Sequence, residues 1–404
     1  MNAVTRVAII GAGPIGLEAA LAAAERGLDF AVYEAAPTVG GNLRRWGHVR
    51  TFTPWDMNVS PRAQRALRGG GGPEGDGLPK GEALADELLE PLAALPAMAG
   101  RIRLGTRVQA VGREGLLKHE GIGSGERAAR PFRLLVGLPD GSEAVERADI
   151  VIDCSGTYGN PNRLGDGGIP APGERAFEDR IVRRLPSLEE APEPWSGATV
   201  LLTGAGHSAQ TAARAFAEFA TQAPGTRVVW AVRSADPDWR AVENDPLPER
   251  EALNRAAVEI AHGASSAVEL RRRTVTEALS ERDGRIVVSL RNGGAEEVVV
   301  DRILALNGGV GDASIYRELQ VHECYATCGP MKLAATLLSA SGGDCLQQAR
   351  RGPETLTNPE PDFFILGAKS YGRDSRFLLN VGWRQVDDVF ASLLPRRRRS
   401  SHSS

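Results

Sequence analysis

The 404-residue sequence predicts an α/β protein in which two units of the same design each contain a parallel sheet. Two observations carry this prediction. An apolar run, a glycine-rich turn and a helix-forming stretch follow one another near the N-terminus and again near residue 200. In addition, apolar runs that end in small residues recur at 147–156 and 301–309. Strand-like runs that alternate with helical stretches are typical of parallel sheets with crossover helices.

The first unit opens on a strand, a turn, a helix and a second strand. The apolar run 6–10 predicts a buried strand, and the sequence GAGPIG occupies 11–16. Residues 17–26 are strong helix formers, and the apolar run 30–33 ends in Glu34. This order is the dinucleotide-binding pattern.

Each glycine of this pattern, and the acid that ends it, has a physical role. Gly11 permits the tight turn, Gly13 lets a pyrophosphate approach the backbone, and Gly16 lets the helix pack closely on the strand. The helix N-terminus offers N–H groups and a positive dipole end to phosphates. Glu34 lies 18 residues after Gly16 and can accept hydrogen bonds from a ribose 2′-OH.

Bulk properties exclude several classes of function. A net charge near −3 does not favour nucleic acid or an acidic membrane surface, and no stretch reaches the roughly 18 apolar residues of a membrane span. No signal peptide precedes the first strand, and four cysteines do not make a disulfide framework. The cytoplasm is the expected compartment. The basic run 396–399 and the residues after it predict a solvated tail.

An aromatic and cationic stretch follows the first unit's acid. Gly40 and Gly41 let the backbone run close to a ligand, and 44–58 then contains two Trp, one Phe, one His and three Arg. Such side chains suit a wall around a flat, charged cofactor. The alternative is a loop that packs under its own aromatic rings. Beyond it, 69–81 predicts a flexible loop.

Regular elements are predicted through the rest of the first unit and at the end of the chain. A helix is expected at 82–95, strands at 101–111, 132–137, 147–153 and 363–367, and a closing helix at 383–394.

The second glycine turn lies at 204–209, with the sequence GAGHSA. A strand at 198–203 precedes it, and a helix through Phe219 follows, so Ala209 takes the third small position. The next strand, 227–232, ends in Arg233 and not in an acid. An Arg there can pair with the 2′-phosphate of NADP, whereas an acid favours NAD. The alternative for Arg233 is a plain surface side chain. His207 is expected to shape this nucleotide site.

The second unit repeats the later part of the first. Strands are expected at 285–290 and 297–306, and 301–309 has the form of 149–156. The series of glycine turn, later strand and small-residue exit therefore occurs twice, which predicts an internal duplication with one nucleotide site in each copy.

These motifs resemble those of the two-dinucleotide-binding-domain flavoproteins, which include thioredoxin reductases, bacillithiol-disulfide reductases and flavin-containing monooxygenases. The resemblance extends from Val4 to about Leu394. It implies two Rossmann-like dinucleotide-binding domains, with FAD and NADPH as cofactors. The residues it implies for FAD are Gly11, Gly13, Gly16, Glu34, Gly40, Gly41 and Asn42. Further residues expected to contact a cofactor are Pro14, Ile15, Trp46, Gly156 and Gly367. Those it implies for NADPH are Gly204, Gly206, His207, Ser208, Ala209 and Arg233.

The resemblance also implies that the NADPH domain is inserted in the FAD domain. On this basis 1–196 is the first part of the FAD domain, and 197–309 is the NADPH domain. The FAD domain returns in 310–395, and 396–404 is a disordered basic and Ser-rich tail.

The sequence departs from these families at three places. The FxGxxxH fingerprint of the monooxygenases is missing from 177–187, and the CxxC of thioredoxin reductases occurs nowhere. The Gly-Asp expected to contact the flavin ribityl is Gly367-Ala368, so Lys369, Ser370, Tyr371 or backbone would take over that contact.

Three cysteines lie close together in sequence, at 324, 328 and 345. Cys328 precedes a helix predicted from about Pro330, and a helix N-terminus lowers a thiol pKa. Three interpretations stay open: small unpaired side chains, a redox pair of Cys324 and Cys328, or metal ligands that include His322. No usual zinc spacing is present, so no metal site is assigned.

The expected core chemistry is hydride transfer from NADPH to FAD. What the reduced flavin then does has three interpretations. The first is a monooxygenase acting on sulfur, nitrogen or carbon of a small molecule, with the stretch 46–55 excluding water. The second is a disulfide or related reductase that uses Cys324 and Cys328, and the third is a non-catalytic redox sensor. Related flavoproteins are often homodimers.

The side chains expected at the reacting centre share a position in the aromatic stretch or the cysteine cluster. His48 is expected to touch substrate or flavin, with a neutral packing role as its alternative. The full set is His48, Trp46, Asn58, Cys324 and Cys328.

Overall fold

The computed structural model describes residues 5–239, 241–242, 244–339 and 352–393. The chain forms two compact units. Unit 1 consists of Met1–Asn160 and Val310–Ser404, and unit 2 consists of Pro161–Gly309. Each unit contains a five-stranded parallel sheet, as the α/β prediction requires.

The start of unit 2 differs from the boundary expected at residue 197. The segment after Pro161 belongs to unit 2 because it is joined to that unit's sheets. Strand β8 (Ile181–Val182) pairs in parallel with β15 (Arg302–Ala305), and the Leu279 N–H donates to the Pro172 carbonyl. Composition could not show this, because the segment is mostly loop and its strand is only two residues long.

The unit 1 sheet is parallel throughout, and successive side chains along its strands point to opposite faces, both of which are packed. Val7 and Ile9 point into one core cluster with the helices, while Ala8 and Ile10 point into another with the antiparallel strands. Alternation of this kind follows from the two-residue period of a strand, and burial of both faces explains the continuous apolar runs. In sheet order the strands are β18 (Phe363–Ile365), β7 (Ile150–Asp153), β1 (Arg6–Ile10), β2 (Asp29–Tyr33) and β3 (Ile102–Arg103).

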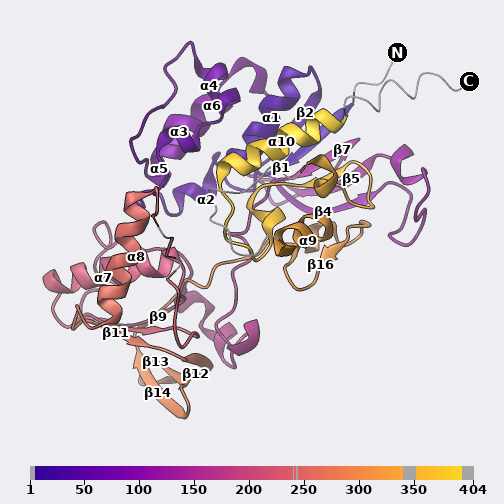
Figure 1. Ribbon diagram of the computed structural model, residues 1–404. Helices are drawn as coiled ribbons and strands as arrows, with labels where there is room; N and C mark the ends of the chain where they lie inside the picture. The colour runs from indigo at the N-terminus through magenta and orange to yellow at the C-terminus, as the bar shows by residue number, and fades with distance from the viewer. Residues whose placement is uncertain (1–4, 240, 243, 340–351, 394–404) are drawn as a thin grey trace, which may run out of the picture. The chain divides into compact units, whose positions relative to one another are not determined.

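Two layers cover this sheet. Helices that share the first core cluster cover one face, and α1 and α10 lie side by side in Figure 1. An antiparallel sheet covers the other face with Phe132, Leu134 and Val136. The helices are α1 (Pro14–Glu25), α4 (Pro61–Leu67), η1 (Leu84–Leu89), α6 (Glu90–Ala93), α9 (Met331–Ser339) and α10 (Leu379–Leu393); the antiparallel strands are β4 (Arg107–Arg113), β5 (Phe132–Gly137) and β6 (Glu143–Ala148).

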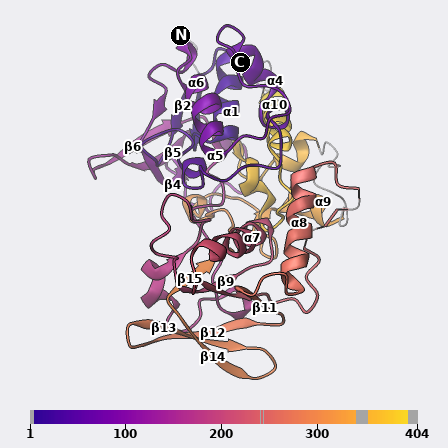
Figure 2. The ribbon, with the colours of Figure 1, turned by 90° about the vertical axis from the view of Figure 1, so that its left-hand side faces the viewer.

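Unit 2 repeats this three-layer plan. Val200 and Leu202 face α7 and α8, which contact each other, and Leu201 faces an antiparallel sheet of three strands (Figure 2). The parallel strands in sheet order are β11 (Val268–Arg271), β10 (Arg227–Ala231), β9 (Thr199–Thr203), β15 and β8. The covering elements are α7 (His207–Gln222), α8 (Pro248–Ala261), β12 (Val275–Arg282), β13 (Arg285–Arg291) and β14 (Ala295–Val300).

The remaining described elements are short and lie in connections. In unit 1 they are α2 (Gly41–Arg44), α3 (Trp55–Asn58), α5 (Gly81–Ala83), η2 (Pro96–Met98), η3 (Arg127–Ala129), η6 (Ser314–Tyr316), β16 (Glu323–Cys324), β17 (Gly329–Pro330), η8 (Pro353–Leu356) and η9 (Gly367–Tyr371). In unit 2 they are η4 (Asp166–Gly168) and η5 (Glu174–Arg180).

The duplication extends to single hydrogen bonds. The Asp149 carboxylate accepts the Arg6 N–H at 2.8 Å, and the Asp301 carboxylate accepts the Thr199 N–H at 2.8 Å. In each unit this aspartate separates the last antiparallel strand from the next parallel strand. The strand expected at 297–306 is therefore two strands, because the chain changes sheet at Asp301.

Two other expected elements are interrupted. The strand expected at 101–111 breaks at Gly105, whose φ of 63° leaves the extended region, so that β3 and β4 belong to different sheets. The helix expected at 82–95 contains the π-helical segment η1, flanked by short α-helical pieces. Among the described residues, no helix has the length and apolar character needed to cross a bilayer.

A buried charge cluster ties the end of β4 to the segment before β18. Glu360 is almost completely buried and receives a hydrogen bond from Arg113 Nε at 2.7 Å and from Arg127 at 2.7 Å. The Arg113 guanidinium also lies 3.5 Å from the centre of the Phe132 ring. Burial opposes ionisation of Glu360, but the hydrogen bonds from Arg127 and Arg113 outweigh it and hold the pKa of this carboxyl below its ordinary value.

Glu360→Gln is expected to destabilise unit 1 by about 3 kcal/mol near neutral pH, because two buried guanidinium groups lose their counter-charge. Since the pKa of Glu360 is lowered in the folded state, its contribution is present above the ordinary value of about 4.5 and is lost as pH falls through the folded-state pKa. Urea unfolding of the wild type and the variant should therefore differ above pH 5 or so and converge in acid. The exposed Glu318→Gln is the matched control. Equal stability of wild type and Glu360→Gln at neutral pH would contradict this assignment.

Candidate functional site

The first glycine turn joins β1 to α1 and needs glycine at its first position. Gly11 has a φ of 98°, in the region that L side chains rarely adopt. A Cβ there would lie 2.8 Å from the Cys154 carbonyl oxygen, which follows the neighbouring strand β7. The Gly11 N–H donates to the Tyr33 carbonyl at 2.8 Å. The turn is therefore fixed between both neighbours of β1.

The other two glycines of this turn are needed for different reasons. Gly13 precedes α1 with extended backbone, and no protein atom lies within 4 Å of the position its Cβ would take. A Cβ at Gly16 would lie 1.8 Å from the Gly11 carbonyl oxygen. The space beside Gly13 is thus open to a ligand, whereas Gly16 serves packing inside the protein. Pro14 and Ile15 are the first residues of α1. The N–H groups of the first turn of α1 that have no partner within the helix therefore lie at the helix end next to Gly13.

Glu34 links the turn to the segment that follows β2. One carboxylate oxygen accepts the Ala12 N–H at 2.7 Å, and the other accepts the Ala36 N–H at 2.8 Å. A carboxylate accepts about four hydrogen bonds, so two positions stay available for ribose hydroxyls. Gly40 has a φ of 64° and donates its N–H to the Ala12 carbonyl at 3.0 Å.

Gly41 and Asn42 begin the short helix α2 beside this acid. A Cβ at Gly41 would lie 2.3 Å from the Ala36 Cβ, so glycine is needed there for close packing, while Asn42 is exposed. The residues expected around the first dinucleotide are therefore brought together from 11–16 and 34–42.

The second glycine turn has the same construction in unit 2. Gly204 has a φ of 113°, and its Cβ would lie 2.4 Å from the carbonyl oxygen of Leu306, which follows the neighbouring strand β15. Gly206 precedes α7 with extended backbone, and His207 and Ser208 are the first residues of that helix. Ala209 is fully buried at the third small position.

Two buried side chains hold this second turn, and sequence reasoning missed both. The Trp230 indole N–H donates to the Gly204 carbonyl at 2.8 Å. The Gln210 amide donates to the carbonyls of Ala205 at 3.1 Å and Trp239 at 2.8 Å. The available signals were a tryptophan inside a buried strand and a glutamine on the apolar face of α7, since such polar groups need partners when buried.

The residue expected to select NADP is placed as the pattern requires. Arg233 is exposed and lies two residues beyond the carboxyl end of β10. Its pairing with a phosphate stays a prediction.

At the carboxyl end of β7, a buried lysine occupies the place where a flavin contact was expected. Lys369 Nζ donates to Asp153 Oδ2 at 2.6 Å, to the Asp312 carbonyl at 2.7 Å and to Ser155 Oγ at 3.2 Å. It also lies 5.0 Å from the centre of the Tyr316 ring. Because these partners satisfy its three donors, Lys369 does not take over the expected ribityl contact.

The neighbouring side chains are also engaged. Ser370 Oγ donates to the Gly367 carbonyl at 2.7 Å and accepts a hydrogen bond from Gln385. The Gly367 N–H donates to Gln385 Oε1 at 2.8 Å, and Gly367 has a φ of 74°. Gly156 also has a positive φ, 72°, and open space at its Cβ position.

The aromatic stretch is a loop packed on the following segment. A Cβ at Gly81 would lie 2.6 Å from the Trp46 ring, and the backbones of Arg50 and Lys80 form an isolated antiparallel β-bridge. His48 lies between these contacts and is half-buried. This arrangement agrees with the alternative of a loop that packs under its own aromatic rings. The contact of His48 with substrate or flavin stays a prediction.

Asn58 shapes the loop and is not placed for chemistry. Both donors of its buried amide bind backbone carbonyls, those of Thr53 and Pro54, at 2.8 Å each. Its oxygen accepts the Thr53 hydroxyl at 3.1 Å. The expected catalytic role for Asn58 is therefore replaced by a structural one.

The described cysteines are all free thiols. Cys324 and Cys328 lie in one tight hairpin, in which the Cys328 N–H donates to the Cys324 carbonyl at 2.7 Å. Helix α9 begins at Met331, close to the expected start, but Cys328 has a φ of 58° and is separated from the helix by β17. The Thr327 hydroxyl and backbone lower the pKa of Cys324, whereas burial raises that of Cys154. Cys345 lies outside the described residues.

Within the described ranges, no group of three or more His, Cys, Asp or Glu side chains could hold a metal ion. His322 accordingly joins no such group with Cys324 and Cys328.

Comparison with known proteins agrees with this geometry. Residues 9–65 match the NAD(P)-binding Rossmann-like domain family. Bacillithiol disulfide reductase Bdr (YpdA) from Bacillus cereus superposes with a TM-score of 0.67 at 18% identity, covering 98% of this chain and 100% of its own. The ornithine N-hydroxylase KtzI from Kutzneria sp. 744, solved with reduced FAD and NADP⁺, gives 0.64 at 13% identity with 98% and 100% coverage. A flavin-containing monooxygenase from Stenotrophomonas maltophilia gives 0.56 at 18% identity with 96% and 100% coverage.

A search of curated protein sequences finds no match to this chain. At these low identities the structural likeness is one of fold, and that fold is the one shared by two-dinucleotide-binding-domain flavoproteins. The expected fold class is confirmed.

The turn geometry predicts a contrast between two alanine variants. Gly16→Ala should destabilise the ligand-free protein by about 1–3 kcal/mol, because its Cβ meets the Gly11 carbonyl oxygen. Gly13→Ala should leave stability within about 0.5 kcal/mol, since its Cβ enters open space and its backbone is extended. Chemical denaturation of the two apoproteins measures the difference. A Gly13→Ala variant as unstable as Gly16→Ala would show that the space beside Gly13 is not open.

Proposed function

We propose that the chain is an FAD- and NADPH-dependent oxidoreductase, and specifically a monooxygenase acting on a small organic molecule. The observation that carries the proposal is the repetition of one turn geometry in two units. Each turn has a first glycine against the carbonyl of a neighbouring strand and a second glycine at a helix N-terminus. Two such turns in one chain support two dinucleotides.

The first turn has features that suit FAD. The open space beside Gly13 can admit a pyrophosphate, and the Glu34 carboxylate has acceptor positions left for ribose hydroxyls. The residues that would hold FAD are Gly11, Gly13, Gly16, Glu34, Gly40 and Gly41. Bound there, FAD would supply hydride acceptance and subsequent two-electron chemistry.

The second turn has features that suit NADPH. Trp230 and Gln210 hold its carbonyls and keep the start of α7 in place for a pyrophosphate. Arg233 beyond β10 can pair with a 2′-phosphate, where an acid would instead favour a free hydroxyl. The residues that would hold NADPH are Gly204, Gly206, Ser208, Ala209 and Arg233.

Two observations favour oxygen over a disulfide as the acceptor of the flavin's electrons. The chain contains no CxxC, and Cys324 and Cys328 belong to unit 1, whereas the second turn belongs to unit 2. The fold itself does not separate the two acceptors, because it is shared with a solved N-hydroxylase and a solved flavin-containing monooxygenase as well as with a solved disulfide reductase. The Trp46 and Trp55 segment would help to exclude water from the reacting centre.

A disulfide or related reductase is the second candidate. Cys324 and Cys328 occupy one tight turn, and Thr327 lowers the pKa of the Cys324 thiol, which raises its thiolate fraction. The fold is shared equally with a solved bacillithiol disulfide reductase.

The decisive experiment is anaerobic reduction by NADPH followed by mixing with oxygen. For a monooxygenase, NADPH should bleach the visible absorbance of the flavin, and oxygen should restore it with peroxide release in the absence of substrate. Stable reduced flavin in air that reoxidises only with a disulfide would establish the reductase instead. If NADPH does not bleach bound flavin, both enzyme proposals fail and a sensor is left.

The cysteines provide an independent test. Replacing Cys324 and Cys328 together by Ser should leave NADPH-dependent oxygen consumption within about twofold of wild type, because the thiols take no part in it. Flavin content, measured by absorbance, is the control for correct folding. If flavin reduction by NADPH persists while turnover with the acceptor is lost, the thiols carry the electrons and the reductase is correct.

A further inference from the structure

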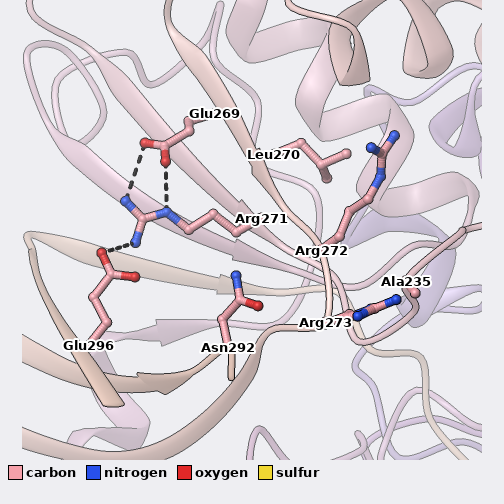
Figure 3. A pocket seen from close by; sticks show the side chains of 8 residues that line it. All are labelled: Ala235, Glu269, Leu270, Arg271, Arg272, Arg273, Asn292 and Glu296. Carbon is pink, nitrogen blue, oxygen red and sulfur yellow. Dashed lines mark hydrogen bonds and ion pairs between the residues drawn. The ribbon is translucent and has the colours of Figure 1, made fainter. Parts of the chain in front are cut away.

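A polar pocket lies at the carboxyl end of β11 in unit 2 and plays no part in the glycine turns. Its volume is about 630 Å³. Its lining comes from β11 and the two residues after it, from the segment that follows β10, and from the hairpin of β13 and β14 (Figure 3). The lining residues are Ala235, Glu269, Leu270, Arg271, Arg272, Arg273, Asn292 and Glu296.

The three consecutive arginines of this pocket are not equivalent. Arg271 is neutralised, because its guanidinium donates to Glu269 at 2.9 Å and to Glu296 at 2.8 Å. Arg273 extends instead toward Ala235, and the structure gives its guanidinium no acidic partner among the described residues. The exposed Arg273 therefore brings an uncompensated positive charge into the pocket.

The backbone places Arg273 beside Arg233. The Arg273 N–H donates to the Ser234 carbonyl at 3.2 Å, and the Thr274 N–H donates to the Val232 carbonyl at 3.0 Å. These two hydrogen bonds bracket Arg233 on the neighbouring segment. Two arginines, each two residues beyond the end of one of two adjacent parallel strands, thus have neighbouring backbones at the carboxyl end of the sheet, where a dinucleotide's adenosine ribose is bound in this kind of unit.

The conformation of Arg273 is unusual for its residue type. Its φ is 52°, in the left-handed region that favours glycine. Unfavourable backbone of this kind is retained where the surroundings enforce it, and it gathers at ligand sites. Glycine would adopt the same turn more easily, so the turn by itself does not require an arginine at this position.

We propose that Arg273 binds the 2′-phosphate of NADPH together with Arg233, and that the pocket beside it receives the phosphorylated adenosine end of the dinucleotide. This inference rests on the proposed NADPH site. A guanidinium matches a phosphate monoester with two parallel hydrogen bonds, which a ribose hydroxyl cannot use in the same way. Selection of NADPH over NADH then depends on two strand ends, of which sequence reasoning identified one.

Arg273→Gly separates this role from a structural one. The variant should lose about tenfold or more in affinity for NADP⁺, while affinity for NAD⁺ changes less than about twofold. Its thermal midpoint should not fall, because glycine accepts the positive φ without penalty. Isothermal titration of the FAD-loaded full chain with NADP⁺ and NAD⁺ measures both affinities. Arg273→Asn, which also tolerates this φ, is the second variant, and Arg227→Ala at the opposite end of β10 is the control.

Each outcome decides one proposal. If Arg273→Gly weakens NADP⁺ and NAD⁺ equally, or weakens neither, the inference is wrong while the NADPH site stands. If the wild type binds neither dinucleotide, the proposed function itself fails. Inorganic phosphate can also be tested as a competitor of NADP⁺ binding. If phosphate competes with NADP⁺ in the wild type but not in the variant, while the NADP⁺ affinity of the variant is unchanged, Arg273 binds free phosphate and the inference is likewise overturned.

Discussion

The close approach of a glycine to a carbonyl oxygen beyond the neighbouring strand is the constraint on which both units depend. Gly11 meets the Cys154 carbonyl and Gly204 meets the Leu306 carbonyl, in both cases with a positive φ. No side chain fits in either gap, so the backbone can turn at once from the strand into the helix. The helix then starts directly at the sheet edge, and its N-terminal N–H groups face the same side as the strand ends.

The two units share this constraint but stabilise it by different means. In unit 1 the Glu34 carboxylate accepts backbone N–H groups from the turn and from the segment after β2. In unit 2 the donors come from side chains instead, since Trp230 and Gln210 bind carbonyls of the turn. The acid at the strand end therefore holds the turn of unit 1 through two backbone N–H groups. In unit 2 the side chains of Trp230 and Gln210 hold the turn, so no acid is needed for that purpose and an arginine can follow the corresponding strand.

Buried ionic groups mark where distant segments of unit 1 join. Lys369 binds Asp153 beside β7, and Glu360 binds Arg113 at the end of β4. Each carboxylate and its partner come from segments that precede and follow unit 2 in the sequence. Such pairs are costly when one member is missing, so removal of either partner leaves an uncompensated buried charge where the returning segment docks.

Local sequence determined the parallel strands other than β8 and β11, both glycine turns, and the acid or arginine after each second strand. These features depend on a few adjacent residues: a positive φ requires glycine, and a buried two-faced strand requires a continuous apolar run. The tertiary structure alone decided what depends on distant partners. It showed that Lys369 is committed to Asp153, that Asn58 binds its own loop, and that unit 2 begins at Pro161. It also brought Arg273 beside Arg233, because adjacent parallel strands juxtapose residues that are 40 positions apart in the sequence.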